Sequence, residues 1–245
     1  MTMADEKPKN QEYAKLFSEI EQMRKRYLTT LASHKVFQKF SKLAAPNVVG
    51  KRKAEKNVKT FRHYLYFFTT VKEAARCYFL IELAKFFDPS KKRNQTRTVY
   101  SILDFAKKNI NRLTKNDFLA FHDGQEFIPE ILMTYKTLEK KNLYRFQKRI
   151  RGNHDKIERL KTYRDQYLAH DDIKKIEVKI TFGEGETLLR IVHDVIELFY
   201  NKLEFASNSY KNFEEEPVRD IERLVNDLAE HEKRRIEELK RKYGI

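Results

Sequence analysis

The segment VKTFRHYLYFFTTVKEAARCYFLIELAKFF, residues 58–87, runs for thirty residues without glycine or proline. Apolar side chains recur along it at the three- and four-residue spacing of a helix, and further apolar residues fall on its other faces. The Asp-Pro-Ser sequence at 88–90 ends the pattern, because proline cannot continue a helix and restricts the residue before it. The segment therefore predicts a central, largely buried helix, with its aromatic run at 61–68 in the core.

Helical spacing continues on both sides of this segment. The expected helices cover about 11–31, 98–106, 128–150, 153–168, 188–206 and 214–243, and a second short segment with apolar spacing lies at 36–43. Six glycines and five prolines are too few for the many turns of an all-β fold. Residues 176–182 alternate apolar and polar side chains, which indicates one short extended segment. The sequence thus predicts an all-α bundle of about six or seven helices.

Three parts are expected along the chain. Residues 1–9 form a flexible tail, residues 10–208 form the helical bundle, and residues 209–245 form a charged C-terminal helix. That last helix has a narrow apolar stripe made of Val218, Ile221, Val225, Leu228, Ile236 and Leu239. A stripe of this width can project from the bundle or pair with a second copy, so the helix is a candidate dimerisation element.

The chain is strongly basic. Lysine and arginine number 51 against 36 aspartates and glutamates, which gives a formal net charge of +15. The densest stretch, residues 140–164, has ten basic residues against two acidic ones, with three aromatics interleaved. Such a surface attracts polyanions and releases counterions where it contacts phosphates. A solvated helix face has the same composition, so charge alone leaves nucleic-acid contact and plain solvation both open.

Cellular location follows from three features of the sequence. Cys77 is the one cysteine, so no internal disulfide forms, and a reducing compartment suits the chain. The N-terminus lacks the apolar stretch of a secretory signal. The most apolar stretch, residues 64–87, includes five charged side chains that a membrane span would not tolerate. We therefore expect a cytoplasmic protein with no membrane partner.

The common cofactor motifs are missing. The sequence has no GxxxxGK[ST], GxGxxG or HExxH pattern, and so few glycines leave no phosphate cradle of the usual kind. His193, Asp194 and Glu197 fall on one predicted helix, but a metal site is not favoured without a second histidine at helical spacing. We expect neither a cofactor nor a metal.

Arg164 and His170 form the most informative pattern. The segment YRDQYLAHDD, residues 163–172, closes an amphipathic helix, with Asp165 directly after the arginine. The planar fork of arginine fits phosphate oxygens, and histidine exchanges protons near neutral pH. On an ideal helix, six residues correspond to about 600° of rotation, so the two side chains would lie about 120° apart. They meet only if the last turn unwinds or if two copies come together.

Two stretches resemble the HEPN superfamily in its abortive-infection, AbiU-type branch. The string Arg164-Asp165-x4-Ala169-His170 is similar to the Arg-x(4–6)-His motif of HEPN ribonucleases. Upstream, the segment FLIELAKFFD at 79–88 is followed by a polar loop and the helix from Thr98. This order resembles the layout of that branch, in which a long helix ends in Leu-Ala-x-x-Phe-Asp and is followed by a loop and a short helix. The pair Arg149 and His154 has the same kind of spacing, but a predicted helix break separates it. One departure is Asp172, where some HEPN toxins have a tyrosine.

The resemblance covers about residues 10–205 and implies a function. HEPN proteins are helical bundles that usually pair as homodimers with two Arg/His motifs facing one another, and active members cut RNA without metal. Arg164 would then stabilise the scissile phosphate, His170 would transfer protons, and Asp165 would orient one of the two. Flanking RNA backbone would be held by Lys148, Arg149, Arg151 and Lys161. An antitoxin or other protein is a further expected partner.

Several alternatives stay open at this stage. A non-catalytic HEPN-like module would bind RNA or a protein partner without cutting. A helical scaffold would dimerise through residues 220–243. Arg164 could also pair with an aspartate at 165, 171 or 172 while His170 simply ends the helix. Glu82 and Asp88 are candidates to line the same cleft as the Arg/His motif.

Overall fold

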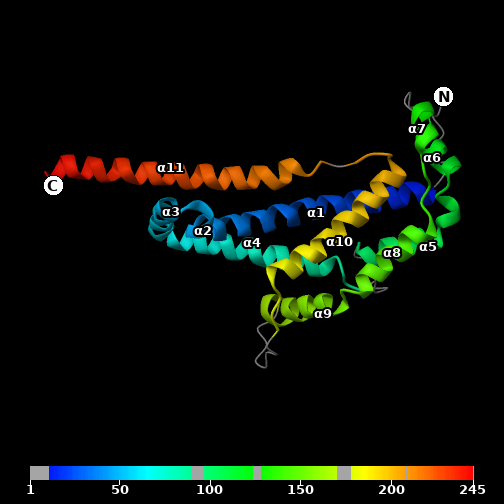
Figure 1. Cartoon of the computed structure of the whole chain (residues 1–245), viewed down its shortest axis with the longest axis horizontal. Coiled ribbons are helices and arrows are strands. Elements are labelled where there is room, and N and C mark those ends of the chain that lie inside the picture. Colours follow the sequence, from blue (N-terminus) through cyan, green and yellow to red (C-terminus); the bar gives the residue numbers. More distant parts are fainter. Residues whose placement is uncertain (1–10, 90–96, 124–127, 170–177, 208, 245) are drawn as a thin grey trace, which may run out of the picture. The chain divides into compact units, whose positions relative to one another are not determined.

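The computed structural model describes residues 11–89, 97–123, 128–169, 178–207 and 209–244. Within these ranges every regular element is a helix, which confirms the all-α prediction (Figure 1). The longer helices are α1 (Gln11–Leu43), α3 (Lys51–His63), α4 (Leu65–Lys85), α5 (Val99–Lys108), α8 (Lys140–Arg151), α9 (His154–Tyr163), α10 (Phe182–Leu203) and α11 (Lys211–Tyr243). The shorter ones are α2 (Pro46–Val49), η1 (Ile110–Arg112), α6 (Lys115–Phe121), α7 (Ile128–Thr134) and η2 (Arg164–Ala169).

The chain divides into two compact units. Unit 1 comprises Met1–Tyr27 and Leu80–Ser209, and unit 2 comprises Leu28–Phe79 and Tyr210–Ile245. This division differs from the expected one, which separated a bundle at 10–208 from a terminal helix at 209–245. The terminal helix shares a unit with residues 28–79 because part of its apolar stripe packs against them.

Unit 1 is built around α10. Ten residues of this helix are buried, and α8 and α9 both pack on it, while α5 packs on α8. Two tyrosines hold its C-terminal end: the Tyr13 hydroxyl donates to the Leu203 carbonyl at 2.8 Å, and the Tyr135 hydroxyl donates to the Lys202 carbonyl at 2.7 Å. The last carbonyls of a helix have no partner within the helix, so these bonds supply partners to two of them.

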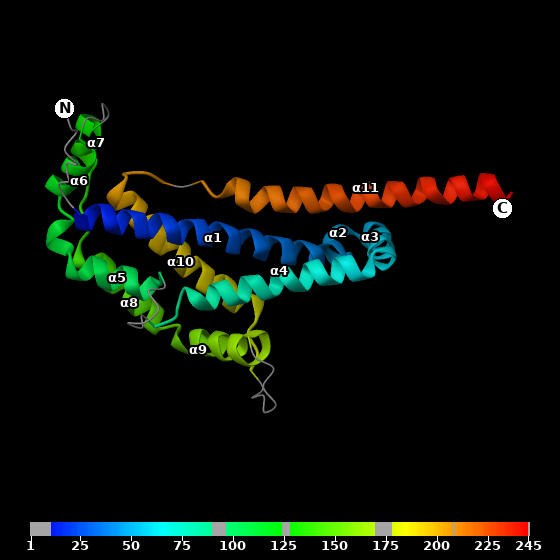
Figure 2. The ribbon, with the colours of Figure 1, turned by 180° about the vertical axis from the view of Figure 1, so that it is seen from behind.

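Unit 2 has a separate apolar core. α11 runs beside α3 in both views (Figures 1 and 2). Ile221 and Val225 of α11 are buried in one cluster with Phe40, Leu43 and Phe68 from α1 and α4. The middle of the stripe expected for dimerisation is therefore covered within the chain itself.

The prediction of one uninterrupted helix over 58–87 is wrong. The chain breaks at Tyr64, whose φ of −117° and ψ of 40° lie outside the helical region, so α3 ends and α4 begins there. The Tyr64 hydroxyl donates to Glu232 Oε1 of α11 at 3.0 Å. This long-range contact accompanies the break, and local helical periodicity carries no sign of it.

The aromatic run at 61–68 is only partly core. Phe61 and Phe68 pack against each other with ring centroids 4.8 Å apart, and Phe68 is buried. In contrast, Tyr66 is 88 % exposed and Phe67 is 51 % exposed. A helix that is apolar on most sides has more apolar surface than unit 2 covers.

Two other boundaries differ from expectation. The predicted helix at 128–150 is divided into α7 and α8 by an irregular stretch that includes the buried Tyr135. No strand forms in the described part of the expected extended segment, 178–182, and residues 176–177 lie outside the described ranges. Thr181 and Glu184 instead form a reciprocal capping box, so α10 starts at Phe182 and includes Gly183 and Gly185.

Candidate functional site

Arg164 lies where α9 changes into a π-helix. Ile157 and Leu160 anchor α9 in unit 1, since both are fully buried. The π-helix η2 follows directly over Arg164–Ala169. A π-helix bonds residue i to i+5 and turns less per residue than an α-helix, so ideal α-helical geometry does not describe residues 164–169. Short π-helical turns are frequent at functional sites.

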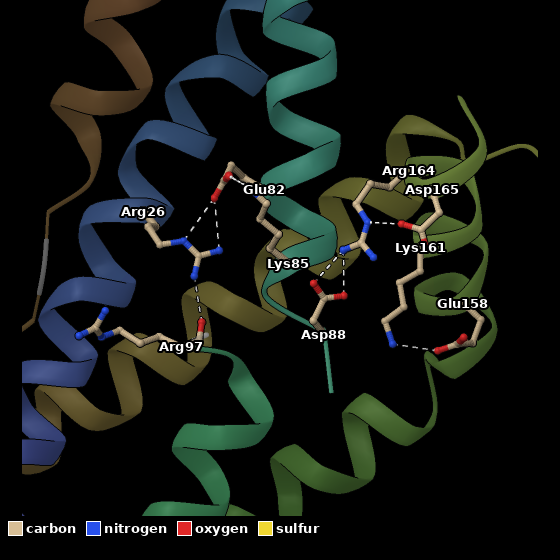
Figure 3. A network of polar contacts seen from close by, with 9 residues as sticks. All are labelled: Arg26, Glu82, Lys85, Asp88, Arg97, Glu158, Lys161, Arg164 and Asp165. Atoms are coloured by element: carbon tan, nitrogen blue, oxygen red, sulfur yellow. Dashed lines mark hydrogen bonds and ion pairs between the residues drawn. The ribbon is translucent and has the colours of Figure 1, made fainter. Parts of the chain in front are cut away.

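Two carboxylates hold the Arg164 guanidinium (Figure 3). Its Nη1 donates to both carboxylate oxygens of Asp88 at 2.8 Å, and its Nε donates to Asp165 Oδ1 at 2.7 Å. Only 16 % of the arginine side chain is exposed, against 26 % for Asp88 and 54 % for Asp165. The Nη2 group has no acceptor among the described residues. The guanidinium is thus fixed in direction, with one edge unbonded.

Arg164 remains charged in this setting. Burial lowers its pKa, but hydrogen bonds to Asp165 and Asp88 outweigh burial and raise the pKa above the ordinary arginine value. One positive charge therefore faces two negative charges, and the three-residue cluster has a net charge of about −1.

Asp88 is placed by the apolar end of α4. Phe86 and Phe87 immediately before it are fully buried, and the next residue, Pro89, cannot extend the helix. The backbone N–H of Val99 donates to the Phe86 carbonyl at 2.8 Å, which ties this end of α4 to the start of α5. The two stretches that resemble the HEPN branch, 79–88 and 163–172, therefore meet through one ion pair.

The comparison with known families gives a match over most of the chain. A model of the HEPN AbiU2 family matches residues 11–229. The chain belongs to the AbiU2 family of HEPN proteins. Neither the curated proteins nor the solved structures give a match. The match extends past residue 205, where the sequence resemblance ended, and reaches into α11.

A second ion-pair network of this AbiU2-family protein is centred on Glu82 of α4, six residues before Asp88. Glu82 accepts from Arg26 Nε at 3.3 Å and from Lys85 Nζ at 2.7 Å. Arg26 also donates from Nη1 to the Arg97 carbonyl at 2.9 Å, and its guanidinium lies 4.6 Å from the ring centroid of Phe86. Sequence reasoning singled out Glu82 but missed Arg26, because 56 residues separate them and no local pattern marks the pair.

The four predicted RNA-binding residues of the AbiU2-family protein differ in their exposure and in their ion pairing. Lys148 and Arg151 are exposed on α8. Arg149 is bonded to Asp194 of α10, and Lys161 is paired with Glu158 at 3.0 Å on α9. The structure therefore leaves two of the four cations open to solvent and pairs the other two with carboxylates.

His170 lies outside the described residues, together with Asp171 and Asp172. The structure accordingly positions Arg164 and Asp165 of the predicted site and leaves the histidine as a sequence-based prediction. Among the residues that are described, no three His, Cys, Asp or Glu side chains gather as a metal site. None of the helices in the described ranges combines the length and apolar character needed to cross a bilayer.

Proposed function

We propose that this AbiU2-family protein is an endoribonuclease that cuts RNA without metal and works as a homodimer. The observation that carries the proposal is the Arg164 guanidinium, held by two carboxylates at the start of a π-helix that leads to His170. Membership in an abortive-infection HEPN family supports the same interpretation. An RNA target and an antitoxin or other protein partner belong to this proposal.

The reaction is an internal transfer of the phosphate. The 2′-oxygen attacks phosphorus, the bond from phosphorus to the 5′-oxygen breaks, and the products are a 2′,3′-cyclic phosphate and a 5′-hydroxyl. One His170 accepts the proton of the 2′-hydroxyl, and the His170 of the second copy donates a proton to the leaving 5′-oxygen. Arg164 donates hydrogen bonds to the charged phosphorane, an effect typically worth about 3–4 kcal/mol per donor.

Asp88 and Asp165 are positioning residues in this scheme. Asp88 occupies Nη1 and Asp165 occupies Nε, so the guanidinium presents Nη2 in one direction. A fixed donor reduces the ordering needed when the phosphate binds. Lys148 and Arg151, exposed on α8, contact the flanking backbone in this proposal.

The test is RNA cleavage in EDTA by the wild type, His170→Ala and Arg164→Ala. Loss of the proton-transfer group or of the phosphate donor lowers the rate by about 100-fold or more. His154→Ala is the matched control, because Arg149 and His154 have a similar spacing but lie across the α8–α9 break. Circular dichroism shows whether each variant keeps its helices. Equal cleavage by His170→Ala and the wild type contradicts the proposal.

A second candidate is a non-catalytic HEPN-like module that binds RNA or a protein. The observation that favours it is the net negative charge around Arg164, where two carboxylates already occupy the donors that a phosphate would use. RNA binding that falls with salt, without cutting in EDTA, supports this candidate over the enzyme.

A further inference from the structure

The helix α3 is a dense strip of positive charge in unit 2. Its thirteen residues, KRKAEKNVKTFRH, include six lysines and arginines against one glutamate, a net charge of +5. The buried residues of the helix are Ala54, Asn57 and Thr60, so the cations stand on the remaining faces. Asn57 donates to the Leu43 carbonyl at 2.9 Å, which fixes α3 against the end of α1.

Two hollows follow this strip, and they adjoin at Lys56. One, of about 340 Å³, lies between α3 and α11 and includes Lys59, Lys233 and Lys240 in its lining. The other, of about 540 Å³, is lined by Lys51, Arg52 and Lys53 and reaches Asn226 of α11. The hollow lined by the start of α3 reaches Asn226, and the hollow lined by its end reaches residues 229–240 of α11. Because the two hollows share Lys56 and follow both helices in the same direction, we treat them as one groove, the α3–α11 groove. The α3 side of this groove is about 18 Å long.

The cations of the α3–α11 groove are mostly unneutralised. Lys56 pairs with Glu230 at 3.1 Å, but both side chains are about half exposed. The other lysines and arginines of α3 form no ion pair with any described residue. Two carboxylates line the groove, and one of them, Glu232, is already bonded to Tyr64 and Arg235. A row of unpaired cations with few carboxylates fits a polyanion.

Two exposed aromatic residues, Tyr66 and Phe67, follow α3 closely in the chain. His63 lines the groove, and Tyr66 and Phe67 follow three and four residues later. Three residues span at most about 11 Å, so the ring of Tyr66 lies within reach of a chain bound in the groove. Basic grooves flanked by exposed aromatics bind single strands, because the cations follow the phosphates while the rings stack on bases.

We propose that the α3–α11 groove binds the backbone of single-stranded RNA, with Tyr66 and Phe67 stacking on unpaired bases at its end. This surface belongs to unit 2, whereas the Arg164 cluster belongs to unit 1. It is an RNA-holding site and takes no part in bond breaking. It therefore stands whether or not the Arg164 and His170 chemistry operates.

The test uses a fluorescent single strand of about 20 nucleotides with 2′-O-methyl groups, which cannot be cut by 2′-oxygen attack. Anisotropy gives its dissociation constant over a series of salt concentrations. The groove variant is Lys53→Gln/Lys56→Gln/Lys59→Gln. The control removes three charges from paired cations of α11 in the same unit, as Lys211→Gln/Arg219→Gln/Arg223→Gln.

The groove variant is expected to bind about tenfold or more weakly at low salt. The slope of log affinity against log salt falls by about 2, because each phosphate that a cation neutralises on a single strand adds roughly 0.7 to the slope. The control keeps its slope within about 0.5 of the wild type. Equal losses in both variants, or an unchanged slope in the groove variant, overturn the proposal. So does a groove variant that keeps RNA affinity but no longer binds phosphatidylserine vesicles.

Stacking is tested separately with Tyr66→Ala. We expect roughly fivefold or greater loss of affinity for the single strand, with the salt slope unchanged, because a ring contributes without releasing counterions. Phe213→Ala, at an exposed ring near the start of α11, is the control and leaves affinity unchanged. Equal affinity of Tyr66→Ala and the wild type removes the aromatic part of the proposal.

Discussion

The two most basic regions of the chain present their charge in different ways. In residues 140–164, five of the ten cations form ion pairs with carboxylates, namely Lys141, Arg149, Arg159, Lys161 and Arg164. In α3, one of six cations, Lys56, has such a partner among the described residues. The stretch with the greater number of charges is therefore the more neutralised one.

The difference lies in what each region does for the fold. Arg149 and Arg159 join α8 and α9 to carboxylates of α10, and Arg164 joins η2 to the end of α4, so these cations link elements of unit 1. Five of the six cations of α3 line the α3–α11 groove, and of the six only Lys56 pairs with a carboxylate among the described residues. A polyanion responds to the field that remains after pairing, and a count of basic residues overstates that field in unit 1.

The largest loss of stability is expected from Ile221→Ala, which removes apolar contact between α11 and the core of unit 2. Ile221 is buried beside Phe40 and Phe68, so the free energy of unfolding falls by about 2–4 kcal/mol. Leu224→Ala, at an exposed position of the same helix, costs less than about 1 kcal/mol. Urea unfolding measures both, and similar losses would show that α11 does not pack as described.

An intermediate effect is expected from Asp88→Asn, which removes the main partner of Arg164. A hydrogen bond to a charged group contributes about 1.5–3 kcal/mol, and partial exposure reduces the expected loss of unfolding free energy to about 1–2 kcal/mol. Glu73→Gln breaks the exposed i,i+3 pair with Arg76 and costs at most about 0.5 kcal/mol. If urea unfolding gives equal losses, the paired cations of unit 1 have no special structural role.

The smallest expected effect is a change in how the free energy of unfolding depends on pH, and it is expected from Asp194→Asn. Burial raises the pKa of Asp194, but hydrogen bonds from Arg149 and His193 outweigh burial and lower the pKa below its ordinary value. A lowered folded-state pKa contributes stability above the unfolded-state pKa, and this stability is lost as the pH falls through the folded-state pKa. The variant should therefore lose less stability than the wild type between about pH 5 and pH 2, because the loss begins near the unfolded-state pKa of aspartate and continues below it.

Urea midpoints at the two pH values measure this change. Asp104→Asn, at an exposed carboxylate of the same unit, is the control and should follow the wild type. A steeper acid loss in Asp194→Asn than in the wild type would contradict the assigned role of the Arg149–Asp194 pair.

Local patterns in the sequence predicted the helical class and the family. The absence of breakers in 58–87, the periodic spacing elsewhere and the two HEPN-like stretches all reported interactions within about ten residues. The break at Tyr64 was not predictable in the same way, because it accompanies a contact with Glu232 of α11. Nor could periodicity show that Tyr66 and Phe67 stay exposed, since the covering elements come from distant parts of the chain.

In the candidate site, too, the sequence predicted local features and missed contacts between distant parts of the chain. Arg164 and its neighbour Asp165 were found from their spacing, and they are hydrogen-bonded as one of the sequence alternatives allowed. Asp88 was flagged as a possible cleft residue, but its direct contact with Arg164 joins positions 76 residues apart. The pairing of Arg149 with Asp194 was also invisible from charge density, because the partner lies on another helix.

The most direct test of the central claim is the chemistry of the RNA ends produced by the wild-type protein in EDTA. Incubation with an unmodified single strand, followed by mass spectrometry of the fragments, identifies both termini at each cut. The account predicts a 2′,3′-cyclic phosphate on one fragment and a 5′-hydroxyl on the other. Intact RNA, or fragments that begin with a 5′-phosphate, would contradict it.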